Sequence, residues 1–275
     1  MTNDLTAIQQ FRPETQCAFE AVESALRLAA NGVGPEGISS KGERDLVTAA
    51  DIAVEDLIRE HLTGTLGLPV VGEELGGEAP GDGTAFWLVD PICGTRNFAS
   101  GIPLYCVNGA LVECGQVTIA VVGDPSTGEI VIAEQGRGAW AVRDGTLRRL
   151  TASDESRAIV VEDGTSKGPR REHAARFTAA VIRADRWYCR SFGTTLPAVY
   201  LAAGRIAACV QMWVPALHAA AGTLLITEAG GVISDYEGRP WSIQSDTLVA
   251  SANAELQHEL LTLLRVTAPQ TDVVS

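Results

Sequence analysis

One short stretch, residues 87–103, constrains the fold more than any other part of the chain. It reads W-L-V-D-P-I-C-G-T-R-N-F-A-S-G-I-P. The apolar run 86–89 has the length and composition of a buried strand, and Asp90 stands at its end. A proline and a glycine then force the chain to turn. A carboxylate is thereby held at a strand end beside the hydroxyl of Thr95 and the cation of Arg96, which suits an anionic ligand bridged by a metal.

Composition excludes two classes of partner. The chain has 275 residues, of which 46% are hydrophobic, enough for one large or two modest cores. Its net charge of −13 argues against nucleic acid or an anionic membrane surface, because either needs a basic face. No apolar run approaches the roughly 18 residues that span a bilayer. The first residues, M-T-N-D-L-T, lack the features of a signal peptide, so a cytoplasmic location is expected.

The cysteines predict reduced thiols. They form no C-x-x-C pair and have no spacing typical of a disulfide framework. Five of them have the character of small core residues, whereas Cys93 lies in the turn after the predicted strand. The six are Cys17, Cys93, Cys106, Cys114, Cys189 and Cys209.

Hydrophobic patterns predict two halves of different architecture. In the first half, a helix at 14–30 precedes short β-rich runs that indicate an antiparallel meander. In the second half, strands alternate with helices, which is typical of an α/β arrangement. Beyond the strand 86–89, the expected strands of the meander are 105–113, 117–122, 129–134 and 138–142. The later strands are expected at 159–162, 188–190, 207–211, 232–234 and 247–251, and the later helices at 170–184, 195–203, 217–229 and 254–264.

The stretch 87–103 resembles the D-P-I-D-G-T signature of the inositol monophosphatase superfamily. Its members are magnesium-dependent, lithium-sensitive phosphomonoesterases. Three further segments carry the same resemblance: D-L-V-T-A-A-D at 45–51, expected to open a second helix; G-E-E at 72–74, after a short strand; and T-E-A-G-G-V at 227–232. They occur in the family's order at near-standard separations.

The resemblance implies an inositol-monophosphatase-like fold of class α+β / α/β, with helices and sheets in alternating αβαβα layers. It divides the chain into an α+β half, residues 1–145, and an α/β half, residues 146–275, that completes the site. Members of the superfamily usually assemble as homodimers, so a homodimer is expected. The reaction implied is in-line attack of a metal-activated water on the phosphate monoester of a small metabolite.

The resemblance also assigns the first metal and its water. It implies that Mg²⁺ is held by Glu73, Asp90 and the carbonyl of Ile92, with Glu74 just behind Glu73. It further implies that the pair of Thr95 and Asp51 activates the attacking water. Taken alone, Asp51 at a helix start is typical of a helix cap. Glu73 and Glu74, as paired acids after a strand, are typical of a solvated turn.

Two positions depart from the family pattern. The signature has its second aspartate where this chain has Cys93. Counting back from Glu228 without a gap places His218 where the family has the aspartate of a W-D pair. Both aspartates are ligands of the second metal, and cysteine and histidine are poor magnesium ligands. Every predicted ligand of the first metal is retained.

Substrate contacts are expected from three segments. A loop leading into a helix, 191–194, offers backbone N–H groups that can hold an anion, with helix capping as the equal alternative. The acid that often binds substrate in the family falls on Gln211, which weakens the case for inositol, since an amide binds a hydroxyl less strongly than a carboxylate does. The predicted substrate-binding residues are Gly94, Thr95, Arg96, Ser191, Gly193, Thr194 and Gln211.

Three hypotheses follow for the second metal position, where Cys93 and His218 replace the two aspartates. The protein can be a slow phosphatase that runs with the first metal alone. Cys93, His218 and Asp90 can instead hold a softer ion such as Zn²⁺ with one position open. In the third hypothesis Cys93 and His218 are a thiolate–imidazolium pair for non-hydrolytic chemistry, or the protein is a catalytically silent binding protein. The predicted catalytic residues are Asp51, Glu74, Cys93, Thr95 and His218.

Overall fold

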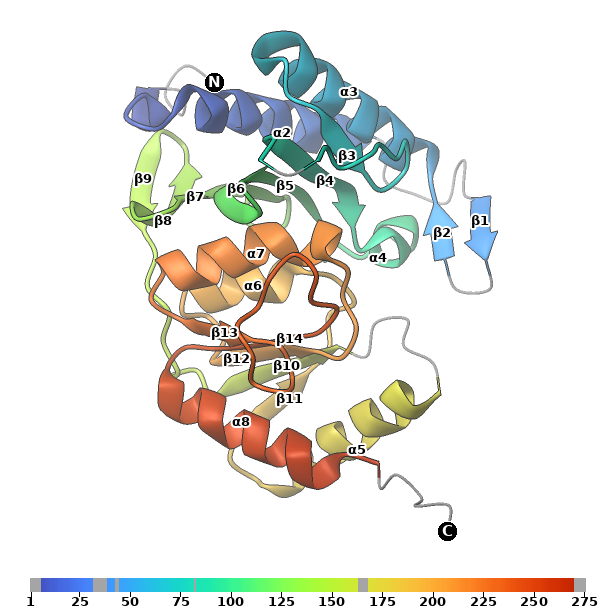
Figure 1. The fold of residues 1–275 in the computed structure, drawn as a ribbon, viewed down its shortest axis with the longest axis vertical. Coiled ribbons are helices and arrows are strands. Elements are labelled where there is room, and N and C mark those ends of the chain that lie inside the picture. Colours follow the sequence, from blue (N-terminus) through green and yellow to red (C-terminus); the bar gives the residue numbers. More distant parts are fainter. Residues whose placement is uncertain (1–5, 32–38, 43–44, 82, 163–167, 270–275) are drawn as a thin grey trace.

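Helices and sheets alternate in five layers (Figure 1). The computed structural model describes residues 6–31, 39–42, 45–81, 83–162 and 168–269. In order, the layers are the helices α2 (Pro13–Asn31) and α3 (Ala49–Leu66), a seven-stranded sheet, the helices α6 (Leu196–Ala202) and α7 (Ala216–Glu228), a five-stranded sheet, and the helices α5 (Pro169–Arg183) and α8 (Ala254–Thr267). The predicted αβαβα fold is confirmed.

The first sheet is an antiparallel meander with one parallel strand added at its edge. Its strands, in spatial order, are β3 (Val70–Gly72), β4 (Phe86–Cys93), β5 (Cys106–Glu113), β6 (Gln116–Asp124), β7 (Glu129–Glu134), β8 (Gly138–Arg143) and β9 (Thr146–Arg149). Only β3 and β4 pair in parallel among these strands. The meander predicted from the sequence is confirmed. The sheet continues through β9, and the division of the chain at 145/146 stays a prediction.

The second sheet is mixed. Its strands, in spatial order, are β11 (Tyr188–Arg190), β10 (Ala158–Glu162), β12 (Ala208–Gln211), β14 (Leu248–Ser251) and β13 (Val232–Ser234). Strand β10 pairs in parallel with both of its neighbours, whereas β14 pairs antiparallel with both of its own. The carboxyl ends of β10 and β12 therefore meet at one edge, where Glu162 is the register partner of Gln211.

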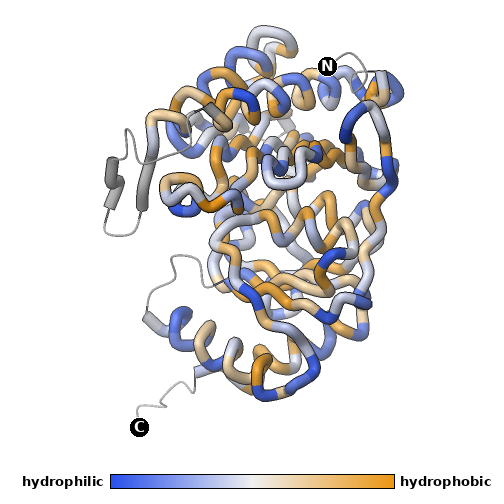
Figure 2. Tube along the Cα trace, turned by 180° about the vertical axis from the view of Figure 1, so that it is seen from behind, coloured by the Kyte–Doolittle hydropathy of each residue, from blue (hydrophilic) through white to orange (hydrophobic). Residues whose placement is uncertain are grey.

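The central strands of both sheets are buried on both faces, which explains their apolar runs, whereas the edge strands β9 and β11 are largely exposed. In β4, Trp87 and Val89 pack toward α2 and α3, while Phe86 and Leu88 pack toward α6 and α7. Two further clusters fill the space between α6/α7 and the second sheet, and between that sheet and α5/α8. Figure 2 shows the hydrophobic residues concentrated in the middle of the molecule, whereas the helices at its two ends also carry hydrophilic residues.

The segment 45–51 does not open a helix as predicted. Its first part is strand β2 (Asp45–Val47), which pairs with β1 (Ser39–Gly42) in a small antiparallel sheet. Helix α3 begins only at Ala49, because Thr48 is its N-cap and forms a reciprocal capping box with Asp51. The extended backbone that this cap requires ends the strand and starts the helix at one residue.

Candidate active site

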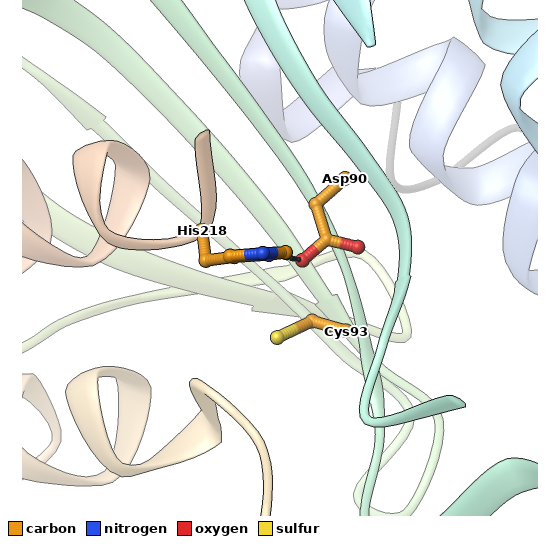
Figure 3. A group of neighbouring side chains, drawn as sticks. All are labelled: Asp90, Cys93 and His218. Carbon is orange, nitrogen blue, oxygen red and sulfur yellow. Dashed lines mark hydrogen bonds and ion pairs between the residues drawn. The ribbon is translucent and has the colours of Figure 1, made fainter. Parts of the chain in front are cut away.

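Three side chains from two layers converge at the end of β4 (Figure 3). Asp90 and Cys93 lie on β4, and His218 is in the first turn of α7. Asp90 is fully buried, Cys93 is nearly so, and His218 is partly exposed. The Nδ1 atom of His218 is 2.6 Å from Oδ2 of Asp90. The expectation that the strand ends at Asp90 is wrong, because β4 continues past Pro91 to Cys93 with a register shift after Asp90. The structure thus brings together the Asp90 carboxylate and both residues that depart from the family pattern.

The predicted pair of Asp51 and Thr95 is in place beside them. The Thr95 hydroxyl lies 3.2 Å from Oδ1 of Asp51 and 3.1 Å from the carbonyl oxygen of Ile92. The other carboxylate oxygen of Asp51 accepts the N–H of Thr48 at 2.8 Å. Burial raises the pKa of Asp51, and the hydrogen bonds from Thr48 and Thr95 oppose that rise. A fixed carboxylate therefore orients a hydroxyl at the end of β4.

The residues predicted for the first metal fit a hard cation. Among the described residues, Oδ1 of the fully buried Asp90 has no hydrogen-bond partner, although a buried carboxylate oxygen normally has one. Burial, together with the nearby Asp90 carboxylate, raises the pKa of Glu73 to about 9. Two crowded carboxylates with an unsatisfied oxygen are what a divalent cation neutralises, and oxygen donors are the ligands that magnesium prefers.

The residues at the second position do not fit magnesium. One ligand atom each from Asp90, Cys93 and His218 lies within 4.8 Å of the others, but only the carboxylate is a hard donor. His218 contacts the Asp90 oxygen directly. Burial alone lowers the pKa of His218, but Asp90 and Cys93 outweigh it and raise that pKa well above its ordinary value.

The surroundings of Cys93 disfavour the thiolate form. A hydrogen bond with Cys106, its register partner on β5, and burial raise the pKa of Cys93 well above its ordinary value. This argues against a preformed thiolate–imidazolium pair with His218. The sulfur accepts the hydroxyl of Thr195 at 2.9 Å and its N–H at 3.3 Å, so the chain leading into α6 is tied to β4.

The loop predicted to hold an anion through free N–H groups holds one of the protein's own carboxylates. Glu162, at the end of β10, accepts the N–H of Phe192, the N–H of Gly193 at 3.0 Å and the hydroxyl of Ser191 at 2.8 Å. The expectation that these N–H groups are free is therefore wrong. The next residue, Thr194, donates its hydroxyl to the carbonyl of Cys93 at 2.8 Å.

The remaining predicted substrate residues are placed as follows. Gly94 has a φ of +104°, and a Cβ there would lie 3.0 Å from the carbonyl oxygen of Leu104, so this turn requires glycine. Arg96 is exposed on the short helix α4 (Thr95–Ala99). Gln211 is buried at the end of β12, and within the described residues its side-chain oxygen has no hydrogen-bond partner.

Sequence reasoning missed Glu55, and it missed the hydrogen-bond partners of Asn97, whose amide follows Thr95 and Arg96 in the stretch 87–103. Glu55 is fully buried in α3 and accepts the N–H groups of Glu74 at 2.6 Å and Leu75 at 3.0 Å, which fixes the turn that carries Glu73. Asn97 donates to the carbonyl of Leu104 at 2.7 Å and, far away in sequence, to that of Phe192 at 2.6 Å. A charged residue on the buried face of a helix was the available signal for Glu55.

Fold and site together define a class: the metal-dependent phosphomonoesterases with αβαβα layers and carboxylates at the strand ends. The family model described as the inositol monophosphatase family matches residues 8–268. The chain belongs to this family, whose members hydrolyse phosphate monoesters.

Named relatives differ in their activities. A histidinol-phosphatase of Chlorobaculum parvum is 32% identical, covering 88% of this chain and 93% of its own. An inositol-1-monophosphatase of Rhizobium meliloti is 36% identical over 77% of this chain and 80% of its own. The Nus factor SuhB of Escherichia coli is 32% identical over 82% of this chain and 86% of its own.

Solved structures agree with this membership. The suhB protein of Bartonella henselae matches with a TM-score of 0.82 at 27% identity, over 92% of this chain and 99% of its own. The Thermotoga maritima IMPase matches with a TM-score of 0.79 at 26% identity, over 90% and 95% of the two chains.

No helix among the described residues is long and apolar enough to cross a membrane.

Proposed function

We propose that this protein hydrolyses the phosphate monoester of a small metabolite with magnesium at the first metal position alone. The observation that carries this proposal is that the residues predicted to hold the first metal and to activate the attacking water are all present. The Thr95 hydroxyl lies within hydrogen-bond distance of both Asp51 and the Ile92 carbonyl. Asp51 is close enough to Asp90 for the Asp90 charge to raise its pKa, and Oδ1 of Asp90 has no hydrogen-bond partner among the described residues. A merely structural pocket has no need for this arrangement.

The residues divide the work as follows. Glu73, Asp90 and the carbonyl of Ile92 would hold magnesium, which supplies positive charge to activate water and to offset charge on the phosphate. As the water attacks, one of its protons passes to the oxygen of Thr95 while the Thr95 proton passes to Oδ1 of Asp51. Because the Thr48 hydrogen bonds fix Asp51, this proton path needs little reorganisation.

The replaced ligands at the second metal position lower the rate of phosphate ester hydrolysis. With Cys93 and His218 in place of two oxygen ligands, no magnesium is held beside the leaving oxygen. A bound metal contributes several kcal/mol to stabilising developing negative charge, so its loss slows turnover by about two to four powers of ten. Instead of a second metal, the contact with His218 keeps the Asp90 carboxylate oriented.

The substrate side favours an alcohol phosphate with a hydroxyl near the phosphate. Gln211 has a buried side-chain oxygen without a partner among the described residues, which can accept a hydrogen bond from a substrate hydroxyl. Gly94 lets the backbone approach the phosphate closely, and Arg96 supplies positive charge at the rim. Relatives named for inositol phosphate and histidinol phosphate make these two compounds the first to test.

A second candidate function is a repurposed site without hydrolysis. The observation that favours it is the replacement of both second-metal aspartates. Non-hydrolytic chemistry by Cys93 and His218, or binding without chemistry, would then remain. A homodimer and a cytoplasmic location, both expected from the sequence and the resemblance, stay predictions.

Phosphate release by the purified protein separates the two candidates. The substrates are inositol 1-phosphate, histidinol phosphate, sugar phosphates and nucleoside monophosphates, with magnesium titrated from zero. The proposal expects magnesium-dependent turnover on at least one substrate, abolished in Asp90→Asn. Silence on all of them in a folded protein would favour the repurposed site.

A further inference from the structure

The position that does not fit magnesium carries the donors of a different ion. Its three side chains offer a thiol sulfur from Cys93, an imidazole nitrogen from His218 and a carboxylate oxygen from Asp90. A sulfur, nitrogen and oxygen set with an open fourth place is a donor combination that zinc accepts and magnesium does not. We propose that Asp90, Cys93 and His218 bind one zinc-class ion, with the fourth position open to water or ligand.

The geometry needs only small movements to close around such an ion. The three ligand atoms already lie within 4.8 Å of one another. Zinc bonds of about 2.0–2.3 Å in tetrahedral array separate ligand atoms by roughly 3.3–3.8 Å. The atoms Nδ1 of His218 and Oδ2 of Asp90, now 2.6 Å apart, would part by less than about 1 Å on this geometry.

The surroundings of the donors suit a fixed metal site. Asp90 is fully buried in β4 between two layers and cannot swing away. The sulfur of Cys93 already accepts two hydrogen bonds from Thr195, a hydroxyl at 2.9 Å and an N–H at 3.3 Å. Such donors orient a metal-bound thiolate and offset its charge, and here they come from another segment than the ligand itself.

The imidazole of His218 is accessible to an ion that enters from solvent. His218 is 23% exposed, and its Nε2 atom faces Glu73 at 3.9 Å rather than a buried wall. An incoming ion replaces the direct contact between His218 and Asp90 and displaces the thiol proton of Cys93. This inference concerns metal occupancy, so it holds or fails whether or not the protein hydrolyses phosphate esters.

Cobalt is the probe, because it takes zinc's place and reports a bound thiolate by colour. Metal-free full-length protein is titrated with Co²⁺ in excess Mg²⁺, and a thiolate-to-cobalt charge-transfer band is followed in the near ultraviolet. Zinc content after dialysis is measured in parallel by elemental analysis. Cys93→Ser and His218→Ala remove one ligand each. Cys114→Ser is the matched control, because Cys114 is an exposed thiol outside the site and not the core residue that its sequence context predicts.

The proposal expects one equivalent of zinc and a charge-transfer band in the wild type and in Cys114→Ser. Cys93→Ser should lose the band entirely, and His218→Ala should weaken cobalt binding at least tenfold. Circular dichroism of each variant checks that it folds. The proposal is overturned if the folded wild type shows no charge-transfer band, or if the band persists in Cys93→Ser.

Discussion

At the scale of single residues, the proposed hydrolysis depends on the hydroxyl of Thr95. Two acceptors surround it, Oδ1 of Asp51 at 3.2 Å and the carbonyl of Ile92 at 3.1 Å. A hydroxyl has one proton to donate and two lone pairs that accept. With its proton directed to Asp51, Thr95 offers a lone pair to the attacking water.

Replacing Thr95 tests this assignment. Thr95→Ala removes the hydroxyl that relays the proton, so kcat should fall by about 10²–10⁴-fold, the usual contribution of a positioned acid–base group. Thr95→Ser keeps the hydroxyl and should retain kcat within about tenfold. Steady-state phosphate release at saturating magnesium measures both. Equal losses in the two variants would show that Thr95 acts through its methyl group and packing.

Glu55 tests how the first metal position is built. It is buried in α3, pairs with Arg59 at 2.8 Å and holds the backbone of the turn behind Glu73. Glu55→Gln keeps the size but loses the charge, so the turn should loosen. Residues that orient metal ligands typically affect metal affinity by 10–100-fold, and we expect the magnesium concentration for half-maximal rate to rise about tenfold.

The control for Glu55→Gln is Glu60→Gln, an exposed residue of the same helix. It should leave the magnesium requirement unchanged. A parallel shift in both variants would mean that helix charge in general, rather than the contact with the turn, sets the magnesium dependence.

At the scale of elements, one carboxylate joins the second sheet to the loop that enters α6. Glu162 ends β10 and accepts donors from three consecutive residues, 191–193. Asn97 and Thr194 then tie the same loop to α4 and β4. The loop is therefore a bridge between the two sheets.

Removing this carboxylate should destabilise the fold. Glu162→Ala removes a buried carboxylate that accepts hydrogen bonds from three residues, and a hydrogen bond to a charged group contributes about 1.5–3 kcal/mol. Glu172→Ala, which removes an exposed ion pair with Arg176, should change stability by less than about 1 kcal/mol. Urea unfolding followed by circular dichroism measures both variants. A Glu162→Ala variant as stable as the control would contradict the bridging role.

The elements themselves were largely predictable, because local pattern and burial agree. The apolar run of β4 alternates between two cores, so both of its faces had to be apolar. Strand β2 escaped prediction because its three residues pair with a segment just upstream, and the helix signal at Thr48 and Asp51 dominated the window. A strand of that length has no period to detect.

The positions of site residues were predictable where the residue lies inside one of the sequence signatures. Asp51, Asp90 and Thr95 lie where the signatures place them, close together at the end of β4. The partners of Glu162 and Asn97 were not predictable, because 29 and 95 residues separate some of these groups in sequence. Only the folded chain shows that the N–H groups of the 191–193 loop face a carboxylate.

At the scale of the whole molecule, the middle helical layer holds the two sheets together. Helices α6 and α7 belong to a cluster with the first sheet and to another with the second. They approach each other closely, since a Cβ added at Gly222 would lie 2.5 Å from the Cβ of Ala198. This glycine is required by packing and not by its backbone angles.

A substitution at this contact should affect the whole fold. Gly222→Ala forces the helices apart, and overpacking of this kind costs about 1–3 kcal/mol. In the double variant Gly222→Ala with Ala198→Gly, the clash is removed, so its loss of stability should be smaller than the sum of the single losses. Thermal unfolding of the three variants measures this coupling. Strict additivity would contradict the close contact.

In the proposed reaction the first metal position works, whereas the second has ceased to be a magnesium site. The decisive experiment is magnesium-dependent phosphate release from the double variant Cys93→Asp with His218→Asp, beside the wild type, in zinc-free buffer. Restoring two oxygen ligands should raise kcat by at least about tenfold, since a second metal stabilises the charge that develops on the leaving oxygen. A folded double variant with no gain over the wild type would contradict the claim.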